Sequence, residues 1–222
     1  MAIALKSKKY NEIVIDSNII NGVLGNNYEE FLRSFKGSNI YYLEKNNRKI
    51  TNSVLNHIDT ISGLDNLEEY TKLLDIDNIK NKNINELSHS DKRLIEYFLM
   101  IESNASIMII NEVYLDLDSD QKRKITVLVK KLIKLGKTII IGSNDSNVIY
   151  SLCKKVLLVN DNNIYYDSVD ILSYSKIINK YHLSMPNILI FINEAKKKNI
   201  NIPKSKDIRD LIKDVYRNVS KK

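Results

Sequence analysis

Three short apolar runs, separated from one another by helical or turn patterns, most constrain the fold of this chain. They are SIMII at 106–110, KTIII at 137–141 and KVLLV at 155–159. A continuous apolar run, in place of strict alternation, is typical of a strand that is buried on both faces. Between the first two runs, a helix is expected to open near Ser119 and Asp120 and to end at Gly136. This alternation predicts an α/β fold with a mostly parallel sheet that helices cover on both faces.

Composition limits the classes of protein that fit. The chain has 222 residues, of which 43% are hydrophobic and 27% are charged, enough for one domain with an appendage. No apolar run approaches the roughly 20 residues that span a bilayer, so we expect no membrane span. The net charge of +7 lies mostly on helical patterns, where a solvated helix face explains it, and nucleic acid is not an expected partner. A reducing cytoplasm and no metal site are expected, because few residues could form a disulfide or a His/Cys metal site and these are widely scattered: Cys153, His57, His89 and His182.

Residues 22–37, GVLGNNYEEFLRSFKG, have the frame of a phosphate-binding loop. Gly25 closes an apolar run, a turn follows, and an amphipathic helix then places Phe31, Leu32 and Phe35 on one face. The lysine and the hydroxyl that such a loop presents to a nucleotide are absent from this stretch. The stretch therefore predicts the backbone of a nucleotide site without its usual phosphate chemistry.

The stretch INELSHSDKRLIEYFLMIESNASIMIINEVYLDLD, residues 84–118, resembles the heart of an ATP-binding cassette (ABC) ATPase. LSHSD at 87–91 stands where that family has its signature LSGGQ, and a helix, an apolar strand, Asn-Glu and Leu-Asp follow in the family's order. GKTIIIGSND at 136–145 is similar to the family's switch strand. The resemblance implies a P-loop NTPase core of ABC type with a mostly parallel sheet, a reduced N-terminal β part and a small helical subdomain at about residues 52–104.

The C-terminal stretch, residues 171–215, narrows the resemblance. Pro186 opens a helix that ends in lysines, and Ile-Pro follows at 202–203. This pattern is similar to the C-terminal extension of energy-coupling-factor (ECF) transporter ATPases. The resemblance implies a trimmed ABC ATPase domain at 1–168 and an appended helical extension at 169–222.

On the phosphate-loop side the resemblance points to lost chemistry. If the two flanking glycines are aligned with the family's, the loop is three residues short, and the degenerate positions are Gly25, Asn27, Tyr28, Glu29 and Glu30. Tyr28, Glu29 and Glu30 replace the lysine and the two hydroxyl residues. Carboxylates at a helix N-terminus already meet the positive end of its dipole, and they would repel a triphosphate.

Other positions of the same site have changed too. Lys45, or Glu44 with a one-residue shift, stands where the family has a magnesium-contacting glutamine, and Asn144 stands at the switch histidine. Asn111 is neutral where a carboxylate would help to hold Mg²⁺. Glu112 keeps the place of the general base and is the candidate catalytic residue. A glutamate that makes a structural hydrogen bond at the end of a strand explains Glu112 equally well.

The opposite side of the molecule keeps more of the family pattern. In ABC ATPases two subunits enclose ATP head to tail, so the signature loop acts on the partner's nucleotide. Ser88 keeps the signature hydroxyl and Asp118 keeps the loop carboxylate, while His89 and Ser90 replace glycines. The alternative is that Ser88 simply caps a helix.

These residues together predict a degenerate ATP-binding subunit of an ECF-type transporter for a vitamin or a transition metal. The expected partners are a second, intact ABC ATPase subunit and a transmembrane coupling subunit at the inner face of the cell membrane. ATP and Mg²⁺ are expected only at the partner's phosphate loop. Two alternatives remain: an active ABC ATPase with an atypical loop, and a soluble regulatory or nucleic-acid-binding pseudo-ATPase.

Overall fold

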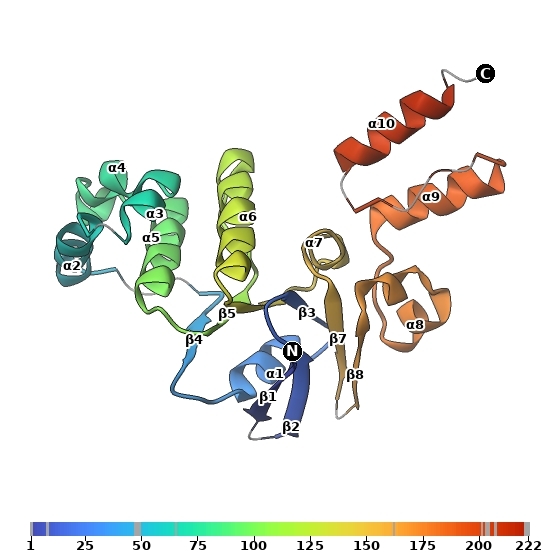
Figure 1. The fold of residues 1–222 in the computed structure, drawn as a ribbon, viewed down its shortest axis with the longest axis horizontal. Coiled ribbons are helices and arrows are strands. Elements are labelled where there is room, and N and C mark those ends of the chain that lie inside the picture. The colour runs from blue at the N-terminus through green and yellow to red at the C-terminus, as the bar shows by residue number, and fades with distance from the viewer. Residues whose placement is uncertain are drawn as a thin grey trace.

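The computed structural model describes residues 2–7, 9–46, 50–64, 66–161, 163–200, 202, 205–206 and 208–219. Its centre is a six-stranded sheet (Figure 1) with the strand order β4 (Ile40–Leu43), β5 (Ile107–Asn111), β6 (Thr138–Gly142), β3 (Ile20–Leu24), β7 (Lys155–Asn160) and β8 (Asn163–Ser168). All neighbouring strands are parallel except β8, which runs antiparallel to β7. The predicted α/β fold with a mostly parallel sheet is confirmed.

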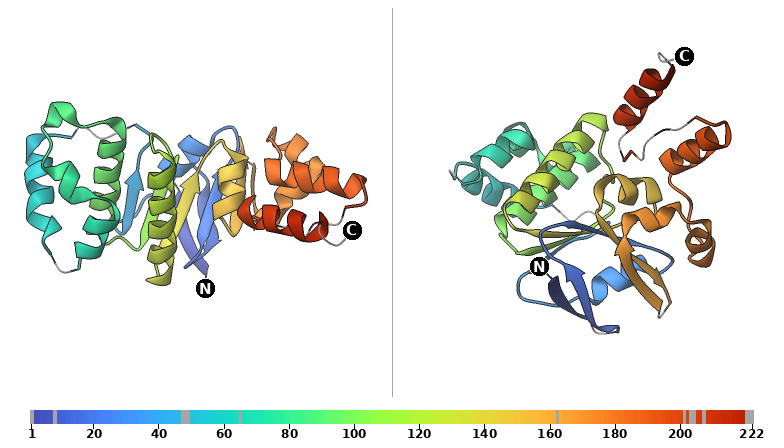
Figure 2. Two further views of the ribbon diagram at one scale, coloured as in Figure 1. Left: turned by 90° about the horizontal axis from the view of Figure 1, so that it is seen from above. Right: turned by 45° about the vertical axis from the view of Figure 1, so that its right-hand side comes forward.

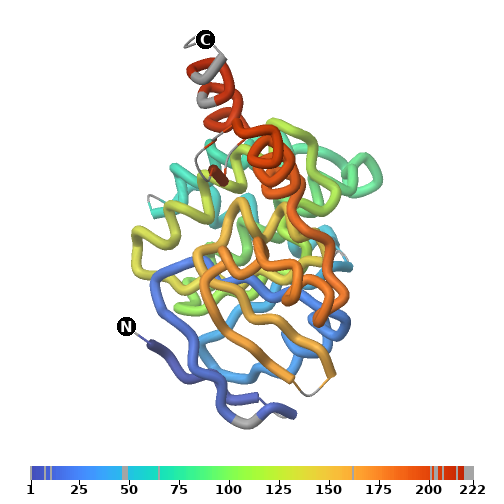
Figure 3. The backbone as a smooth tube through the Cα atoms, turned by 90° about the vertical axis from the view of Figure 1, so that its right-hand side faces the viewer, coloured from blue at the N-terminus to red at the C-terminus, as the bar shows by residue number. Residues whose placement is uncertain are grey.

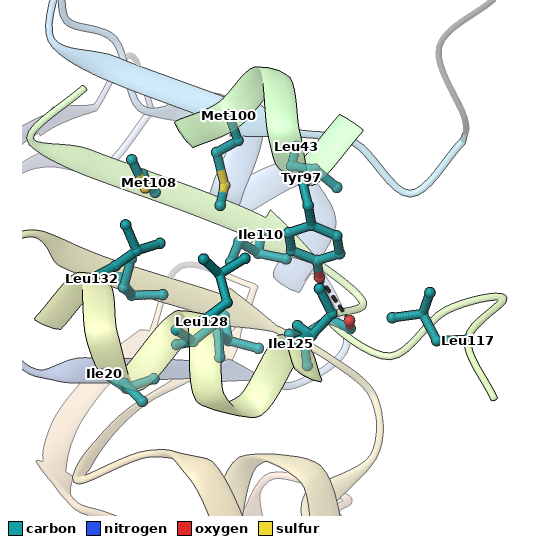
Figure 4. Packing of buried hydrophobic residues seen from close by; sticks show 14 of the residues in the cluster. Ile20, Leu43, Tyr97, Met100, Met108, Ile110, Leu117, Ile125, Leu128 and Leu132 are labelled. Carbon is teal, nitrogen blue, oxygen red and sulfur yellow. Dashed lines mark hydrogen bonds between the residues drawn. The ribbon is translucent and has the colours of Figure 1, made fainter. Parts of the chain in front are cut away.

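Both faces of the sheet are covered, as the continuous apolar runs require. Every residue of β3 and of β6 is buried. On one face lie α5 (His89–Glu102), α6 (Ser119–Lys134) and α7 (Ser146–Leu152), and Figure 4 shows Leu128 and Leu132 of α6 lying against the sheet beside Met108 and Ile110. On the other face lie α1 (Tyr28–Ser34) and the antiparallel pair β1 (Ala2–Ser7) and β2 (Asn11–Asp16), packed on Ile109, Ile140 and Leu157. Alternate residues of β3, β5, β6 and β7 therefore belong to two separate cores.

A group of helices packs beside β4 at one end of the sheet (Figure 1). It consists of α2 (Asn52–Ser62), α3 (Glu68–Leu73), α4 (Ile76–Lys80), the 3₁₀ turn η1 (Ile84–Glu86) and α5. Ile58, Leu74 and Ile76 are fully buried in the larger core, which they share with α5 and α6. This group joins the start of α5 to the central sheet.

The C-terminal helices lie at the other end of the sheet (Figures 2 and 3). They are the 3₁₀ turn η2 (Val169–Ser173), α8 (Ser175–Lys180), α9 (Asn187–Lys197) and α10 (Ile208–Val219). Pro186 directly precedes α9 and opens that helix as predicted. Pro203 lies outside the described residues. In the part of the chain that the structure describes, no helix is both long and apolar enough to cross a bilayer.

Candidate functional site

The turn between β3 and α1 is short and tightly closed. Only residues 25–27 separate Leu24, the end of β3, from Tyr28, the start of α1. The Tyr28 amide donates to the Gly25 carbonyl over 3.3 Å. Gly25 has φ 129°, and a Cβ there would lie 1.9 Å from the Val159 carbonyl oxygen, so only glycine fits. The predicted strand, turn and helix are therefore present, but the Tyr28 amide is used by the Gly25 carbonyl within the turn.

Tyr28 crosses the carboxyl end of the sheet, the edge at which α/β folds hold phosphate groups. The residue is 1% exposed, and its ring lies so close to β6 that a Cβ on Gly142 would come within 2.8 Å of it. Its hydroxyl donates to Glu112 Oε1 over 2.6 Å. Burial, and then this hydrogen bond, raise the pKa of the Tyr28 hydroxyl far above its ordinary value. The phenol therefore keeps its proton and remains a donor to the carboxylate.

Glu112 lies directly after β5 in a left-handed conformation with φ 55°. Its Oε2 accepts the Ser143 hydroxyl over 2.7 Å, and its Oε1 accepts the Asn144 amide over 3.1 Å as well as the Tyr28 hydroxyl. Both carboxylate oxygens are thus used within the chain. A general base needs a lone pair directed at the proton it removes. The described contacts match the alternative in which Glu112 makes structural hydrogen bonds at the end of a strand.

The two glutamates of the loop lie in different surroundings. Glu29 pairs with Lys45 at 3.2 Å, and its Oε1 lies 3.3 Å from the Tyr28 hydroxyl, whose proton is directed to Glu112. Both glutamates lie in the first turn of α1, as predicted, but Glu30 pairs at 2.8 Å with Lys9, in the turn after β1. Of the two candidates after β4, Lys45 reaches the loop, because Glu44 pairs with Arg33 at 3.1 Å. We call Tyr28, Glu29, Lys45, Glu112, Ser143 and Asn144 the phosphate-loop cluster.

Arg93 bonds the backbone at the ends of β4 and β5, next to this cluster. The sequence did not identify Arg93 as a site residue. Its guanidinium is wholly buried and donates to the carbonyls of Glu44 (2.6 Å), Asn111 (2.7 Å) and Glu112 (3.0 Å). It also pairs with Glu96 at 3.2 Å. The available signal was an Arg-Glu pair three residues apart on α5, a spacing that predicts an ion pair but not its burial.

Asn111 contributes only its backbone to this arrangement. Its side chain is fully buried, and neither amide atom has a hydrogen-bond partner among the described residues. A neutral carboxamide in this position adds no negative charge for a cation. Asn27, at the end of the turn, reaches outward and donates to Asp161 over 3.2 Å.

The signature positions begin the helix on the other side. Ser88 caps α5: its Oγ accepts the Asp91 amide over 3.0 Å, and the Asp91 carboxylate accepts the Ser88 amide over 2.9 Å. Ser90 shares a hydrogen bond of 3.0 Å with Ser88, and His89 is exposed. Asp118 caps α6 by accepting the Gln121 amide over 2.8 Å.

These four residues stand apart from the loop cluster. Among the described residues, no hydrogen bond or ion pair joins Ser88, His89, Ser90 or Asp118 to the phosphate-loop cluster. The structure therefore brings the residues of the phosphate-loop cluster together, whereas the signature residues and Asp118 lie at the capped starts of α5 and α6.

Comparison with known proteins gives partial relatives. No family model matches the chain. A Clostridium tetani protein that is assigned as an ABC transporter ATP-binding protein is 27% identical over 93 residues, which are 42% of this chain and 21% of that protein. An uncharacterized one of Methanocaldococcus jannaschii is 28% identical over 42% of this chain and 36% of its own length. One of Pyrococcus furiosus is 25% identical over 61% of this chain and 49% of its own length. The matches thus span about a fifth to a half of these relatives.

Comparison with solved structures decides the fold. An ABC transporter assigned to the metal-chelate type, in an inward-facing conformation, aligns with a TM-score of 0.59 over 82% of this chain and 88% of the other, at 16% identity. The fold is that of an ABC-type P-loop NTPase. Together with the partial relatives, it supports the resemblance at the level of an ABC transporter ATP-binding component.

An ABC-type site holds Mg-ATP, and the residues of this loop do not fit that ligand as they are arranged. Mg²⁺ requires oxygen ligands that are free to bind it. Here Glu112 already accepts three hydrogen bonds, Asn111 is neutral and buried, and the buried Tyr28 ring lies at the edge of the sheet. Among the described residues, no group of three His, Cys, Asp or Glu side chains could hold a metal ion. No step of ATP hydrolysis can be derived from this cluster.

Proposed function

We propose that this chain is a degenerate ATP-binding subunit of an ECF-type ABC transporter. The observation that carries the proposal is the 2.6 Å hydrogen bond from Tyr28 to Glu112 across the phosphate-loop position. It joins the residue in place of the phosphate lysine to the residue in place of the general base. In this proposal neither group is available to a nucleotide.

Nucleotide binding at this loop would require the cluster to open. Hydrogen bonds to a charged group are each worth about 1.5–3 kcal/mol net, and Glu112 accepts three of them. The buried Tyr28 ring would also have to leave its place beside Gly142. Since the affinity of a ligand falls tenfold for each 1.4 kcal/mol or so of such cost, we expect no useful affinity for ATP at this site.

The side that begins α5 and α6 supports a role in a pair of subunits. Ser88, His89 and Asp118 lie at the starts of two long helices, where amide groups and the helix dipole favour an anion. In the proposal, this side completes the nucleotide site of an intact ATPase partner, which holds ATP and Mg²⁺ on its own phosphate loop. The chain then transmits closure of the pair without hydrolysing ATP itself.

The ECF assignment rests on the C-terminal pattern and on the helices that it forms, α9 and α10. We infer a transmembrane coupling subunit as the second partner and a peripheral position at the inner face of the membrane. In this proposal the membrane components select the transported vitamin or metal.

The test is calorimetric titration of the purified chain with Mg-ATP. We expect no saturable binding at millimolar nucleotide. A dissociation constant in the micromolar range would instead favour the active ATPase with an atypical loop. Steeply salt-dependent binding of DNA or RNA would favour the nucleic-acid-binding alternative.

A further inference from the structure

A cleft lies between the ABC-type core and the C-terminal helices. Its volume is about 800 Å³, within the range of small-molecule sites. Its walls come from α6, from α7 and from the first turns of α9 and α10. No residue of the phosphate-loop cluster lines it, so its use does not depend on the function proposed above.

The cleft carries an excess of positive charge. Lys130 of α6 lines one side, and Lys206 and Arg209 line the other. The one carboxylate among the described lining residues, Asp210, already pairs with Lys213 at 3.2 Å. The first turns of α9 and α10 add the positive ends of two helix dipoles. An anion in the cleft would thus meet cations from both walls.

Lys206 lies between the core and α10, and the Asp170 carboxylate acts on it only through space. Its ammonium donates to the Cys153 carbonyl over 3.2 Å and lies 5.6 Å from the centre of the Tyr150 ring. It forms no ion pair with any described residue. Although solvent still reaches the side chain, the loss of part of its water lowers the pKa of Lys206. The attraction to Asp170 offsets this loss only in part, and a phosphate in direct contact with the ammonium would compensate it better.

The remaining wall is apolar and aromatic. Tyr150, Val148 and Ile188 line it, and Tyr114 lies beside them with its hydroxyl already bonded to Thr126. Rings and aliphatic side chains of this kind hold the flat or apolar body of a small ligand. The cleft therefore combines a cationic side for an anionic group with an apolar side for the rest of the molecule.

We propose that this cleft binds a small molecule that carries a phosphate group on an aromatic or apolar body. The phosphate contacts Lys206, Lys130 and Arg209, and the body lies against Tyr150. Because the ligand touches the core and the C-terminal helices at once, it fastens α10 to α6 and α7. The consequence is a protein whose C-terminal extension is more firmly held when the ligand is present.

The test uses phenyl phosphate and inorganic phosphate, titrated by calorimetry into the full chain at fixed ionic strength. We expect saturable binding of phenyl phosphate and an affinity about threefold to tenfold weaker for inorganic phosphate, which lacks the ring. Lys206→Gln should weaken phenyl phosphate binding about tenfold or more, since a hydrogen bond to a charged group is lost. The control is Lys196→Gln, which removes the same charge from an exposed position of α9 outside the cleft and should change the affinity less than about twofold.

A second variant and a second measurement keep the outcome decisive. Lys130→Gln, on the opposite wall, should weaken binding about threefold, and hydrogen exchange of α10 should slow when phenyl phosphate is added. Absence of saturable binding at millimolar phenyl phosphate would overturn the proposal. Equal loss in Lys206→Gln and Lys196→Gln would also overturn it, because general charge attraction would then explain the binding. Retained binding by Tyr28 variants separates this cleft from the phosphate loop.

Discussion

The phosphate-loop cluster and the capped starts of α5 and α6 differ in how their polar groups are used. In the cluster, Tyr28, Ser143 and the Asn144 amide all donate to Glu112, so the polar groups satisfy one another. At the helix starts, Ser88 and Asp118 each complete a cap while their surroundings face solvent. The comparison shows that the polar groups of the phosphate-loop cluster can bond one another while the starts of α5 and α6 stay exposed to a partner.

Arg93 connects the two regions, and its removal should have the largest effect on stability. It lies on α5, which Ser88 caps, and it holds the strand ends that carry Glu112. Arg93→Met would remove a buried donor from Glu96 and from several carbonyls, at a cost of about 3–5 kcal/mol in the free energy of unfolding. Urea unfolding followed by circular dichroism measures this loss.

A matched control for Arg93 is Arg123→Met on the exposed side of α6, where the ion pair with Asp120 is open to solvent. Its loss should cost less than about 1 kcal/mol. Similar costs for the two variants would mean that Arg93 does not hold the two regions together.

The second prediction contrasts the two regions in an assembled complex and rests on the proposed function. Ser88→Arg should lower ATP turnover by about 10²- to 10³-fold, because bulk and charge replace a donor beside the partner's γ-phosphate. Glu112→Gln should leave turnover within about twofold, because no base is needed at a closed site. Steady-state hydrolysis by the complex, with assembly verified for each variant, is the measurement. The opposite ranking would show that this chain hydrolyses ATP itself.

Much of this contrast could be anticipated from local patterns. The apolar runs predicted the parallel strands, Ser119 and Gly136 marked the ends of α6, and the missing lysine pointed to altered loop chemistry. Such features depend on spacing along the chain, which the sequence displays directly.

The contacts that close the site could not be anticipated in the same way. Tyr28 and Glu112 are 84 residues apart, and they meet only because β3 and β5 flank β6 in the sheet. The pairing of Glu30 with Lys9 likewise depends on where the β1–β2 turn lies against α1. The inward direction of Arg93 depends on α5 packing over the strand ends, since most arginines lie at the surface.

The third prediction isolates the hydroxyl of Tyr28 from its ring. Tyr28→Phe removes the donor to Glu112 and should cost about 1.5–3 kcal/mol of stability. It should not restore ATP binding, because the ring still fills the edge of the sheet beside Gly142. The control is Tyr165→Phe, whose hydroxyl bonds Asp167 on the exposed surface of β8, and it should cost less than about 0.5 kcal/mol. Micromolar ATP binding by Tyr28→Phe would locate the block in the hydrogen bond and not in the ring.

The smallest effect concerns the capped side and separates capping from recognition at Ser88. Ser88→Ala loses the hydrogen bond to the Asp91 amide and should cost about 1 kcal/mol, whereas Ser88→Asp, which can still cap, should cost little. Ser90→Ala should leave stability nearly unchanged, because Ser90 bonds only the Ser88 hydroxyl among the described residues. Thermal unfolding of the isolated chain measures the cap alone. Turnover of the complex measures recognition: Ser88→Asp keeps the cap but sets a carboxylate against the partner's phosphate. If Ser88→Asp is stable and the complex is inactive, the two roles are distinct, and if it is stable and fully active, Ser88 serves only to begin α5.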